Sequence, residues 1–237
     1  MQGVLFVDKP VGWTSFDVVN YVRRMVAELE GKKPKNVKVG HCGTLDPFAT
    51  GLLILLVGKE YTRQAESLTK RDKTYEATFV LGSTSTTGDP EGELTAVSDT
   101  VPMQEAMLES LVGFRGQIQQ TPPQFSAIKI NGQKAYDLAR KGVAVDIPVR
   151  TVTIHELELV EYAYPEVKIR TRVSSGTYIR SLAEDIGATL KTGAYCSQLR
   201  RTSIAQWDVS QAATVEQLKS QPIESFLHAL TPEDLLA

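Results

Sequence analysis

The chain has 237 residues, of which 42% are hydrophobic, and it carries a formal net charge of −2. This size and apolar content can supply the core of one large domain or two small ones. The apolar run LLILLV is far shorter than the ~20 residues of a membrane span, and MQGVLFVDKP has no signal-peptide pattern, so we expect a cytoplasmic protein. Two cysteines and three widely spaced histidines predict neither a disulfide framework nor a metal site.

Charge is distributed unevenly along the chain. Residues 23–38 contain six basic and two acidic side chains, and residues 168–201 contain seven basic and two acidic ones. Residues 89–109 and the last twenty residues are acidic. The basic segments are either solvated faces or sites for a polyanion, and composition alone leaves both open.

The amino-terminal third predicts strand, helix and strand. VLFVDKP is typical of a short strand that ends at Pro10, and LLILLV has the length of a buried strand. Between them, TSFDVVNYVRRMV predicts an amphipathic helix with Thr14 and Asp17 at capping-box spacing. Its expected apolar stripe consists of Phe16, Val19, Val22 and Val26.

The stretch GHCGTLDPFATGLLILLVG, residues 40–58, places one acid, Asp46, just ahead of the apolar strand. Asp followed by Pro is common where a helix begins or a chain turns. Taken alone, the stretch therefore favours a cap or turn role for Asp46 over a chemical one.

Further along, YEATFVLG alternates so that Tyr75, Ala77, Phe79 and Leu81 face the core, and Tyr75 is either an ordinary core residue or a site residue. The loop STSTTGDPEGE is rich in turn formers. FSAIKINGQKAYDLARKG predicts a strand, a turn at Asn131-Gly132 and a short helix closed by Gly142. EVKIRTRV predicts a strand with Lys168, Arg170 and Arg172 on a face that could meet phosphates.

The segment SSGTYIRSLAEDIGATL predicts a helix with Ser175 or Thr177 as its N-cap. Arg180 then falls in the first turn, off the apolar stripe. A cation there opposes the helix dipole by roughly 0.3 to 1 kcal/mol, and Glu184 stands in the weaker orientation for a helical ion pair. Arg180 is thus either a solvated surface residue or the partner of a carboxylate outside its helix, which it would keep ionised.

Six blocks of this sequence, taken in order, resemble those of the TruB family, the tRNA pseudouridine-55 synthases. The similarity covers nearly all of residues 3–204. The blocks are GVLFVDKPVGWTSFDVV, GHCGTLDPFATGLL, Lys73-Thr74-Tyr75, QQTPPQFSAIKINGQKAYDLAR, SSGTYIRSLAEDIGATL and GAYCSQLRRT.

The resemblance implies an isomerase that acts on a uridine in the T loop of tRNA, without a cofactor or a metal. It assigns the catalytic nucleophile to Asp46 and a base contact, with a possible proton transfer, to Tyr75. It assigns the entry and stacking of the flipped nucleotide to His41. Tyr178 and Arg180 would line the pocket, with Arg180 paired to Asp46, and Leu199 would close its apolar wall, while Lys9 and Pro10 would support the site.

These roles agree with general chemistry. A base in a folded loop must leave its stack, at a cost of a few kcal/mol, before an enzyme can reach it. Planar side chains recover part of that cost. A carboxylate can then add to the sugar carbon or promote elimination at the ribose, in a pocket whose apolar wall excludes water.

The implied fold is α+β, a mixed and largely antiparallel sheet flanked by helices and loops, in a single catalytic domain over residues 1–237. Residues 207–237 would form a short C-terminal extension, too short for the RNA-binding PUA domain of many relatives. Ser85-Thr86-Thr87 and Tyr195 depart from the family pattern and could alter RNA contacts. We expect a monomer.

Two alternatives remain open on sequence grounds, because scaffolds are reused across functions. One is a non-catalytic RNA-binding or tRNA-folding protein on the same scaffold. The other is an aspartate-dependent glycosidase or nucleosidase, which would release free uracil.

Overall fold

The computed structural model describes residues 1–126, 128–130, 132–139, 146–231 and 234. They form two compact units: unit 1 comprises Met1–Thr74 and Arg200–Ala237, and unit 2 comprises Tyr75–Leu199. Strands β4 (Lys73–Leu81) and β12 (Ala194–Ile204) have residues in both units. None of the helices in the described part of the chain is long and apolar enough to cross a membrane.

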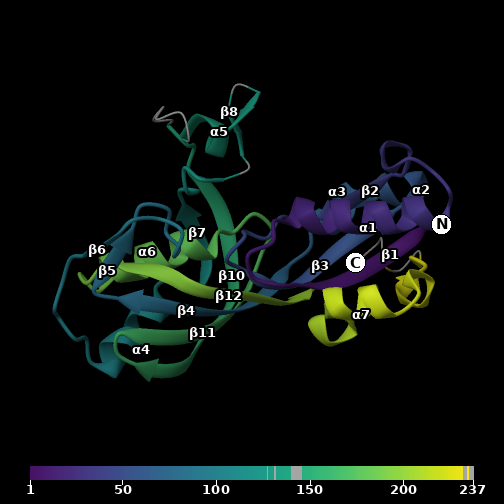
Figure 1. The fold of residues 1–237 in the computed structure, drawn as a ribbon. Helices are drawn as coiled ribbons and strands as arrows, with labels where there is room; N and C mark the ends of the chain where they lie inside the picture. Colours follow the sequence, from purple (N-terminus) through teal and green to yellow (C-terminus); the bar gives the residue numbers. More distant parts are fainter. Residues whose placement is uncertain (127, 131, 140–145, 232–233, 235–237) are drawn as a thin grey trace. The chain divides into compact units, whose positions relative to one another are not determined.

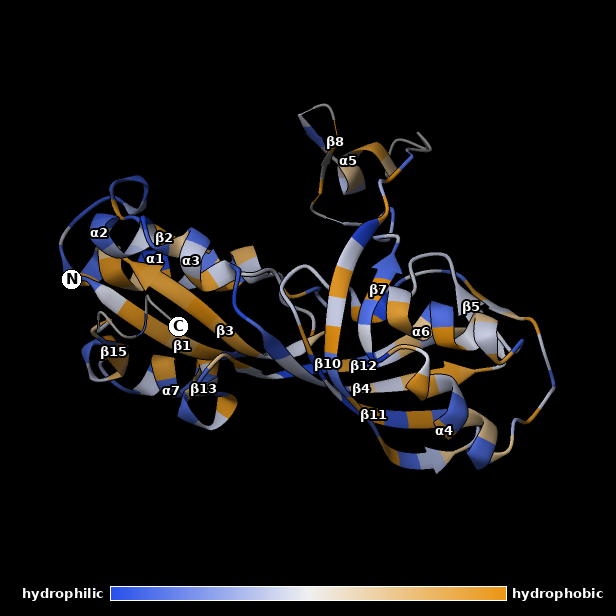
Figure 2. Ribbon diagram, turned by 180° about the vertical axis from the view of Figure 1, so that it is seen from behind, coloured by the Kyte–Doolittle hydropathy of each residue, from blue (hydrophilic) through white to orange (hydrophobic). Residues whose placement is uncertain are grey.

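Unit 1 is built on β1 (Gly3–Lys9) and β3 (Thr50–Val57), which run antiparallel with Leu5 opposite Leu55. Strand β2 (Val39–Cys42) pairs antiparallel with β3. Every residue from 51 to 57 is buried, because both faces of β3 are covered. Figure 2 shows β3 as an almost continuous hydrophobic band, which confirms the strand predicted from LLILLV.

The predicted amino-terminal helix is α1 (Ser15–Leu29), and its capping box between Thr14 and Asp17 is confirmed. The predicted stripe is wrong at Phe16, which is 57% exposed. At 100° per residue, the buried stripe through Val19, Val22 and Val26 continues back to Ser15 and leaves Phe16 on the flank. There the Phe16 ring lies 5.6 Å from the Arg23 guanidinium.

The rest of unit 1 consists of short elements. Besides short helices, residues 206–231 contain three two-residue strands. One of them, β14, pairs parallel with β1, and another, β15, pairs antiparallel with β1. The helix of the same segment, α7, lies next to β1 (Figure 1). These elements are η1 (Pro34–Asn36), α2 (Lys59–Thr62), α3 (Ala65–Thr69), β13 (Trp207–Asp208), η2 (Val209–Gln211), β14 (Ala213–Thr214), α7 (Val215–Ser220), η3 (Ile223–Phe226) and β15 (Leu227–His228).

In unit 2 the strands follow the order β12-β4-β11-β10-β7, and the pairs of β10 with β11 and with β7 are antiparallel. Strand β11 (Glu166–Val173) alternates as predicted, with Val167, Ile169, Thr171 and Val173 buried. This hydrophobic alternation differs from the uniform pattern of β3. The remaining strands and helices are β5 (Ser83–Ser85), β6 (Leu94–Ala96), α4 (Gln104–Val112), β7 (Gly116–Gln120), β8 (Lys129–Ile130), β9 (Gln133–Lys134), α5 (Ala135–Ala139), β10 (Arg150–Ala163) and α6 (Ile179–Thr189).

The prediction of a loop for STSTTGDPEGE is wrong for its first three residues, which form β5 and pair antiparallel with β6, so that residues 86–93 connect the two strands of a hairpin. The predicted strand, turn and short helix of residues 125–142 correspond to the hairpin of β8 with β9 and to α5. Asn131 of the turn and the closing Gly142 lie outside the described residues. The prediction of an α+β protein with a mixed, largely antiparallel sheet is confirmed.

Candidate active site

The loop that carries Asp46 connects β2 to β3 within unit 1. Asp46 is half-buried, and of the cap or turn role expected from the stretch alone the turn is confirmed, because no helix begins here. Residues 47–49 form one turn, in which the amide of Ala49 donates to the carbonyl of Asp46 at 3.1 Å, and β3 begins at Thr50. The loop therefore presents an acid on a turn that ends in a buried strand.

Two buried cations hold the flanks of this loop. Lys9 is fully buried, and its ammonium donates to the carbonyls of Pro10 at 2.9 Å, Trp13 at 2.6 Å and Pro47 at 3.3 Å. Arg201, also fully buried, donates from Nη2 to the carbonyl of Gly43 at 3.1 Å. Because Gly43 and Pro47 bracket Asp46, both ends of the loop are tied to the core of unit 1.

Beneath the loop lies a buried group that consists of Cys42, Lys73 and Arg201. Burial, and after it the charge of Arg201, lower the pKa of Lys73 to about 8. Its ammonium donates to the carbonyls of Thr69 and Arg71. Burial raises the pKa of the Cys42 thiol to about 12, so this cysteine is a neutral packing residue. His41, on β2 beside Cys42, is half-buried.

In unit 2, Arg180 is 3% exposed, so the interpretation as a solvated surface arginine is wrong. Its Nη1 donates to the Asp89 carboxylate at 2.9 Å and to the carbonyl of Thr87 at 2.7 Å, and its Nη2 donates to the carbonyl of Phe125 at 2.8 Å. Asp89 is itself buried, and its other oxygen accepts from the Thr87 hydroxyl and the Glu91 amide. The prediction of a carboxylate partner outside the helix is confirmed with Asp89.

The N-cap predicted for α6 is wrong, because the helix begins at Ile179 with Tyr178 as its N-cap and without a side-chain cap bond. The Thr177 hydroxyl donates to the carbonyl of Ser174 and so closes the preceding turn instead. The buried side chain of Gln120 holds the backbone at the start of α6 instead. Its carbonyl oxygen accepts from the amide of Tyr178 at 2.8 Å, and its amide group donates to the carbonyl of Tyr178 at 3.0 Å.

The Tyr178 ring carries a cation on its face, since the Arg150 guanidinium lies 4.8 Å from its centroid. Tyr75 and Leu199 also belong to unit 2, and they are 7% and 8% exposed. Tyr75 faces inward at the start of β4, as predicted. Unit 2 thus fixes a tyrosine at the entry to α6, a buried arginine two residues further on, and the buried side chains of Tyr75 and Leu199.

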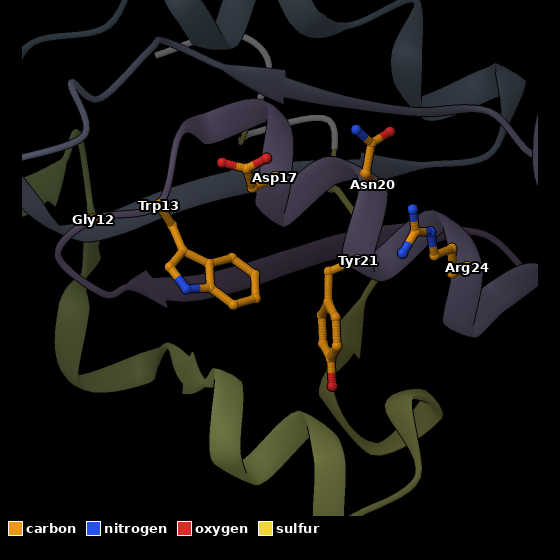
Figure 3. A pocket seen from close by; sticks show the side chains of 6 residues that line it. All are labelled: Gly12, Trp13, Asp17, Asn20, Tyr21 and Arg24. Atoms are coloured by element: carbon orange, nitrogen blue, oxygen red, sulfur yellow. The ribbon is translucent and has the colours of Figure 1, made fainter.

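A separate cavity of about 370 Å³ lies in unit 1, lined by Gly12, Trp13, Asp17, Asn20, Tyr21 and Arg24 (Figure 3). The rings of Trp13 and Tyr21 meet edge to face, with their centroids 5.8 Å apart. Burial, and then the charge of Glu216 on α7, raise the pKa of Tyr21. None of the site residues predicted from the sequence lines this cavity.

Comparison with known proteins decides the family. The family model for TruB family pseudouridylate synthase (N terminal domain) matches residues 30–179, and that for the tRNA pseudouridylate synthase B C-terminal domain matches residues 180–231. The tRNA pseudouridine synthase B of Azoarcus sp. (strain BH72) is 44% identical over 236 residues, which cover 100% of this chain and 76% of the relative. The chain belongs to the TruB family. The enzyme of the same name from Phocaeicola vulgatus is 44% identical over 95% of this chain and 97% of its own length.

Solved structures agree with membership of the TruB family. A chain of a Cbf5-Nop10-Gar1 complex superposes with a TM-score of 0.70 at 29% identity, over 92% of this chain and 54% of its own. A chain of the archaeal box H/ACA sRNP Nop10-Cbf5 complex gives a TM-score of 0.65 at 27% identity, over 92% and 53%. This TruB-family chain spans about half the length of those chains, and the predicted pseudouridine synthase fold is confirmed.

The individual roles inferred from the TruB resemblance, and the pairing of Arg180 with Asp46, stay predictions. Two contacts were not predicted from the sequence. These are the pairing of Asp89 with Arg180 and the binding of the Tyr178 backbone by Gln120. Asp89 lies 91 residues from Arg180 and Gln120 lies 58 residues from Tyr178, so no local periodicity connects either pair. The available signal was the acid Asp89 within the Gly-Asp-Pro turn of the polar loop STSTTGDPEGE.

Proposed function

We propose that this chain isomerises uridine to pseudouridine in tRNA, at the T-loop uridine known as uridine-55. The observation that carries the proposal is the similarity over the whole chain to relatives named tRNA pseudouridine synthase B. The described geometry supports it, because one acid sits on a turn anchored at both ends and a buried arginine stands at the start of α6.

The reaction needs no second substrate. The bond from C1′ of the ribose to N1 of the base breaks, and a bond from C1′ to C5 forms. The hydrogen leaves C5, and N1 ends with a hydrogen, so that the atoms balance within one nucleotide. The detached base is itself the acceptor, and water must be kept away from the intermediate.

In this proposal Asp46 acts as the carboxylate that adds to C1′ or promotes elimination at the ribose. Tyr75 contacts the target base and assists the proton transfer. His41 receives the flipped nucleotide by stacking, which offsets part of the cost of unstacking the base. Tyr178 and Leu199 provide the walls of the pocket.

Arg180 pairs with Asp46 in the proposed mechanism and keeps it ionised where desolvation would favour the neutral acid. A guanidinium is suited to two partners at once, because it carries five donors in a rigid fork. Its bond to Asp89 fixes the orientation of that fork. We propose that the protein acts on the T stem-loop as a monomer and uses neither a cofactor nor a metal.

The test is incubation with an unmodified tRNA transcript, followed by chemical mapping of pseudouridine. Wild type should modify the T-loop uridine, Asp46→Asn should give no product, and Arg180→Ala should lose about 10²- to 10³-fold in rate, the scale of a lost electrostatic group in a dry site. The matched control is Glu66→Gln, which makes the same type of change as Asp46→Asn at an exposed position on α3 and should leave the rate unchanged.

Two outcomes would contradict the proposal. Tight binding of tRNA by wild type without any pseudouridine would favour the RNA-binding alternative. Abasic sites with release of uracil would favour the glycosidase.

A further inference from the structure

Ser15, the first residue of α1, has a hydroxyl that its helix does not need. The N-terminus of α1 is capped by Thr14 and Asp17, whose capping box is complete. Ser15 is 2% exposed. A buried hydroxyl that takes no part in capping must find its partners elsewhere in the fold.

Both hydrogen-bonding functions of this hydroxyl are directed to Leu45, the residue before Asp46. The Ser15 Oγ accepts from the amide of Leu45 at 2.8 Å and donates to its carbonyl at 3.0 Å. Leu45 is 3% exposed, so water could not easily replace the hydroxyl of Ser15 as the hydrogen-bond partner of its backbone. One side chain thus fixes both polar groups of a residue 30 positions away.

The residue after Asp46 is fixed from the same segment of chain. The carbonyl of Pro47 accepts from the amide of Gly12 at 2.8 Å and from the ammonium of Lys9 at 3.3 Å. Residues 9–15 therefore hold the chain on both sides of Asp46. Pro47 has no amide hydrogen and a restricted φ, so the loop can move little without losing these bonds.

We infer that Ser15 is a positioning residue for Asp46, an inference that rests on the proposed function. Its hydroxyl holds the backbone at Leu45 in the register that directs the next side chain, Asp46, at the reacting nucleotide. Lys9 and Gly12 hold the other side, and on the amino-terminal side Ser15 binds the residue directly before Asp46, whereas Arg201 binds the more distant Gly43. A displacement of about 1 Å at a reacting group can lower a rate about 100-fold.

A buried serine can also act on stability alone, and the experiment must separate the two roles. Ser110 on α4 offers a matched control, because it is buried at 9% exposure and its hydroxyl donates to the carbonyl of Met107 within its own helix. Ser15→Ala and Ser110→Ala remove the same atoms from buried sites, but only the first touches the loop of Asp46.

The measurement is the single-turnover rate of pseudouridine formation with enzyme in excess over tRNA, together with the tRNA dissociation constant and thermal unfolding. Ser15→Ala should lower the rate about 10- to 100-fold, with tRNA affinity within about threefold of wild type. Ser110→Ala should leave the rate within about twofold, and the unfolding temperatures of both variants separate loss of stability from loss of rate. Ser15→Thr, which keeps the hydroxyl, should recover most of the rate.

Ser15→Cys gives the same comparison if the alanine variant does not fold, since a thiol fills the space but is a weak hydrogen-bonding group. A folded Ser15→Ala or Ser15→Cys protein with a rate within twofold of wild type would overturn the inference. So would a loss that lies wholly in tRNA affinity, or an equal loss of rate in Ser110→Ala. Absence of pseudouridine with wild type would instead remove the proposed function and with it the role of Ser15.

Discussion

The two units hold their candidate catalytic side chains by different means. In unit 1, the loop of Asp46 is fixed through its backbone, by donors that bind the carbonyls of Gly43 and Pro47. In unit 2, Arg180 is fixed through its own charged group, which binds the Asp89 carboxylate and two carbonyls. The anchors of the Asp46 loop bind its backbone, whereas the anchor of Arg180 uses part of the donor fork of its own side chain.

The difference has a consequence for sensitivity to substitution. Loss of a single donor to the backbone of the Asp46 loop can shift that loop and slow the reaction, but the other donors remain, so we expect only a small loss of stability. Loss of Asp89 leaves a buried cation without its charged partner, and such a cation is costly in a low-dielectric interior. We therefore expect the site in unit 2 to be the more fragile of the two.

Substitution of Asp89 by alanine tests that comparison with the largest expected effect. Breaking a buried ion pair from one side costs about 3 to 5 kcal/mol, so unit 2 should unfold at markedly lower urea concentration. Far-UV circular dichroism should detect this unfolding. Trp13 and Trp207 both belong to unit 1, so tryptophan fluorescence reports on unit 1 in the same samples.

The control for Asp89→Ala is Glu161→Ala, which breaks the exposed pair of Glu161 with Lys168 in the same unit. Exposed ion pairs contribute little to stability, so the urea unfolding transition of Glu161→Ala should stay close to that of wild type. Equal stability of the two variants would contradict the greater fragility assigned to the buried pair. Pseudouridine formation by folded Asp89→Asn should still be slower than in wild type, because the amide retains an oxygen acceptor but not the charge.

A substitution at Gly187 tests how strongly unit 2 depends on the position of α6, the helix that carries Arg180. A Cβ at this position of α6 would lie 2.3 Å from the amide nitrogen of Ala194 on β12, so helix and strand would have to separate. Gly187→Ala should lower the free energy of unfolding by about 3 kcal/mol and slow pseudouridine formation. Unfolding is again followed by circular dichroism.

Gly116→Ala in the same unit is its control. Gly116 has a φ of +87° with open space around it, and alanine there should cost only about 1 kcal/mol of backbone strain. A cost for Gly187→Ala no larger than that for Gly116→Ala would show that the close approach of α6 to β12 does not constrain the helix.

The pH dependence of stability distinguishes Lys73, in unit 1, from a surface lysine. Its pKa is about 8 in the folded protein and 10.5 in the reference state, so between these values the unfolded chain binds more protons. Burial of the cation thus opposes folding fully below pH 8, and the penalty is relieved as the pH rises toward 10.5. Between pH 7.5 and 10, the free energy of unfolding of wild type should therefore rise by about 2 kcal/mol relative to that of Lys73→Met.

Urea unfolding followed by tryptophan fluorescence measures this gain in unit 1. The control is Lys70→Met, which removes an exposed lysine near the end of α3 and leaves Lys73 in place, so this variant should keep the gain that Lys73 gives wild type. A difference from Lys73→Met that is constant with pH would contradict the lowered pKa of Lys73.

Local patterns in the sequence predicted the regular elements well. Alternation in EVKIRTRV identified the buried face of β11, and the run LLILLV identified β3, because both patterns record burial directly. Thr14 and Asp17 identified the start of α1, since a capping box acts over four residues. Phe16 was misplaced because its apolar side chain lies on the flank of the helix, where a pattern of residue types cannot separate partial cover from burial.

The candidate site was predictable only in part. The resemblance located Asp46 and Arg180 from contiguous motifs, and the unfavourable position of Arg180 at a helix N-terminus correctly indicated an external partner. The identity of that partner, and the anchoring of Leu45 by Ser15, depend on contacts between residues 91 and 30 positions apart. Such contacts follow from how the chain is folded in three dimensions, and one sequence does not encode them in any local pattern.

The basic face of β11 gives the smallest expected effect. Lys168 and Arg172 bind carboxylates at 2.6 and 2.9 Å, whereas Arg170 lies 3.8 Å from Glu76. If this face meets phosphates, as predicted, Arg170 is the cation most easily released to do so. Arg170→Gln should then reduce the slope of log affinity for tRNA against log salt by about 1 at most, while Glu76→Gln should strengthen binding slightly. Unchanged salt slopes in both variants would show that the cations of β11 serve the neighbouring carboxylates and not the RNA.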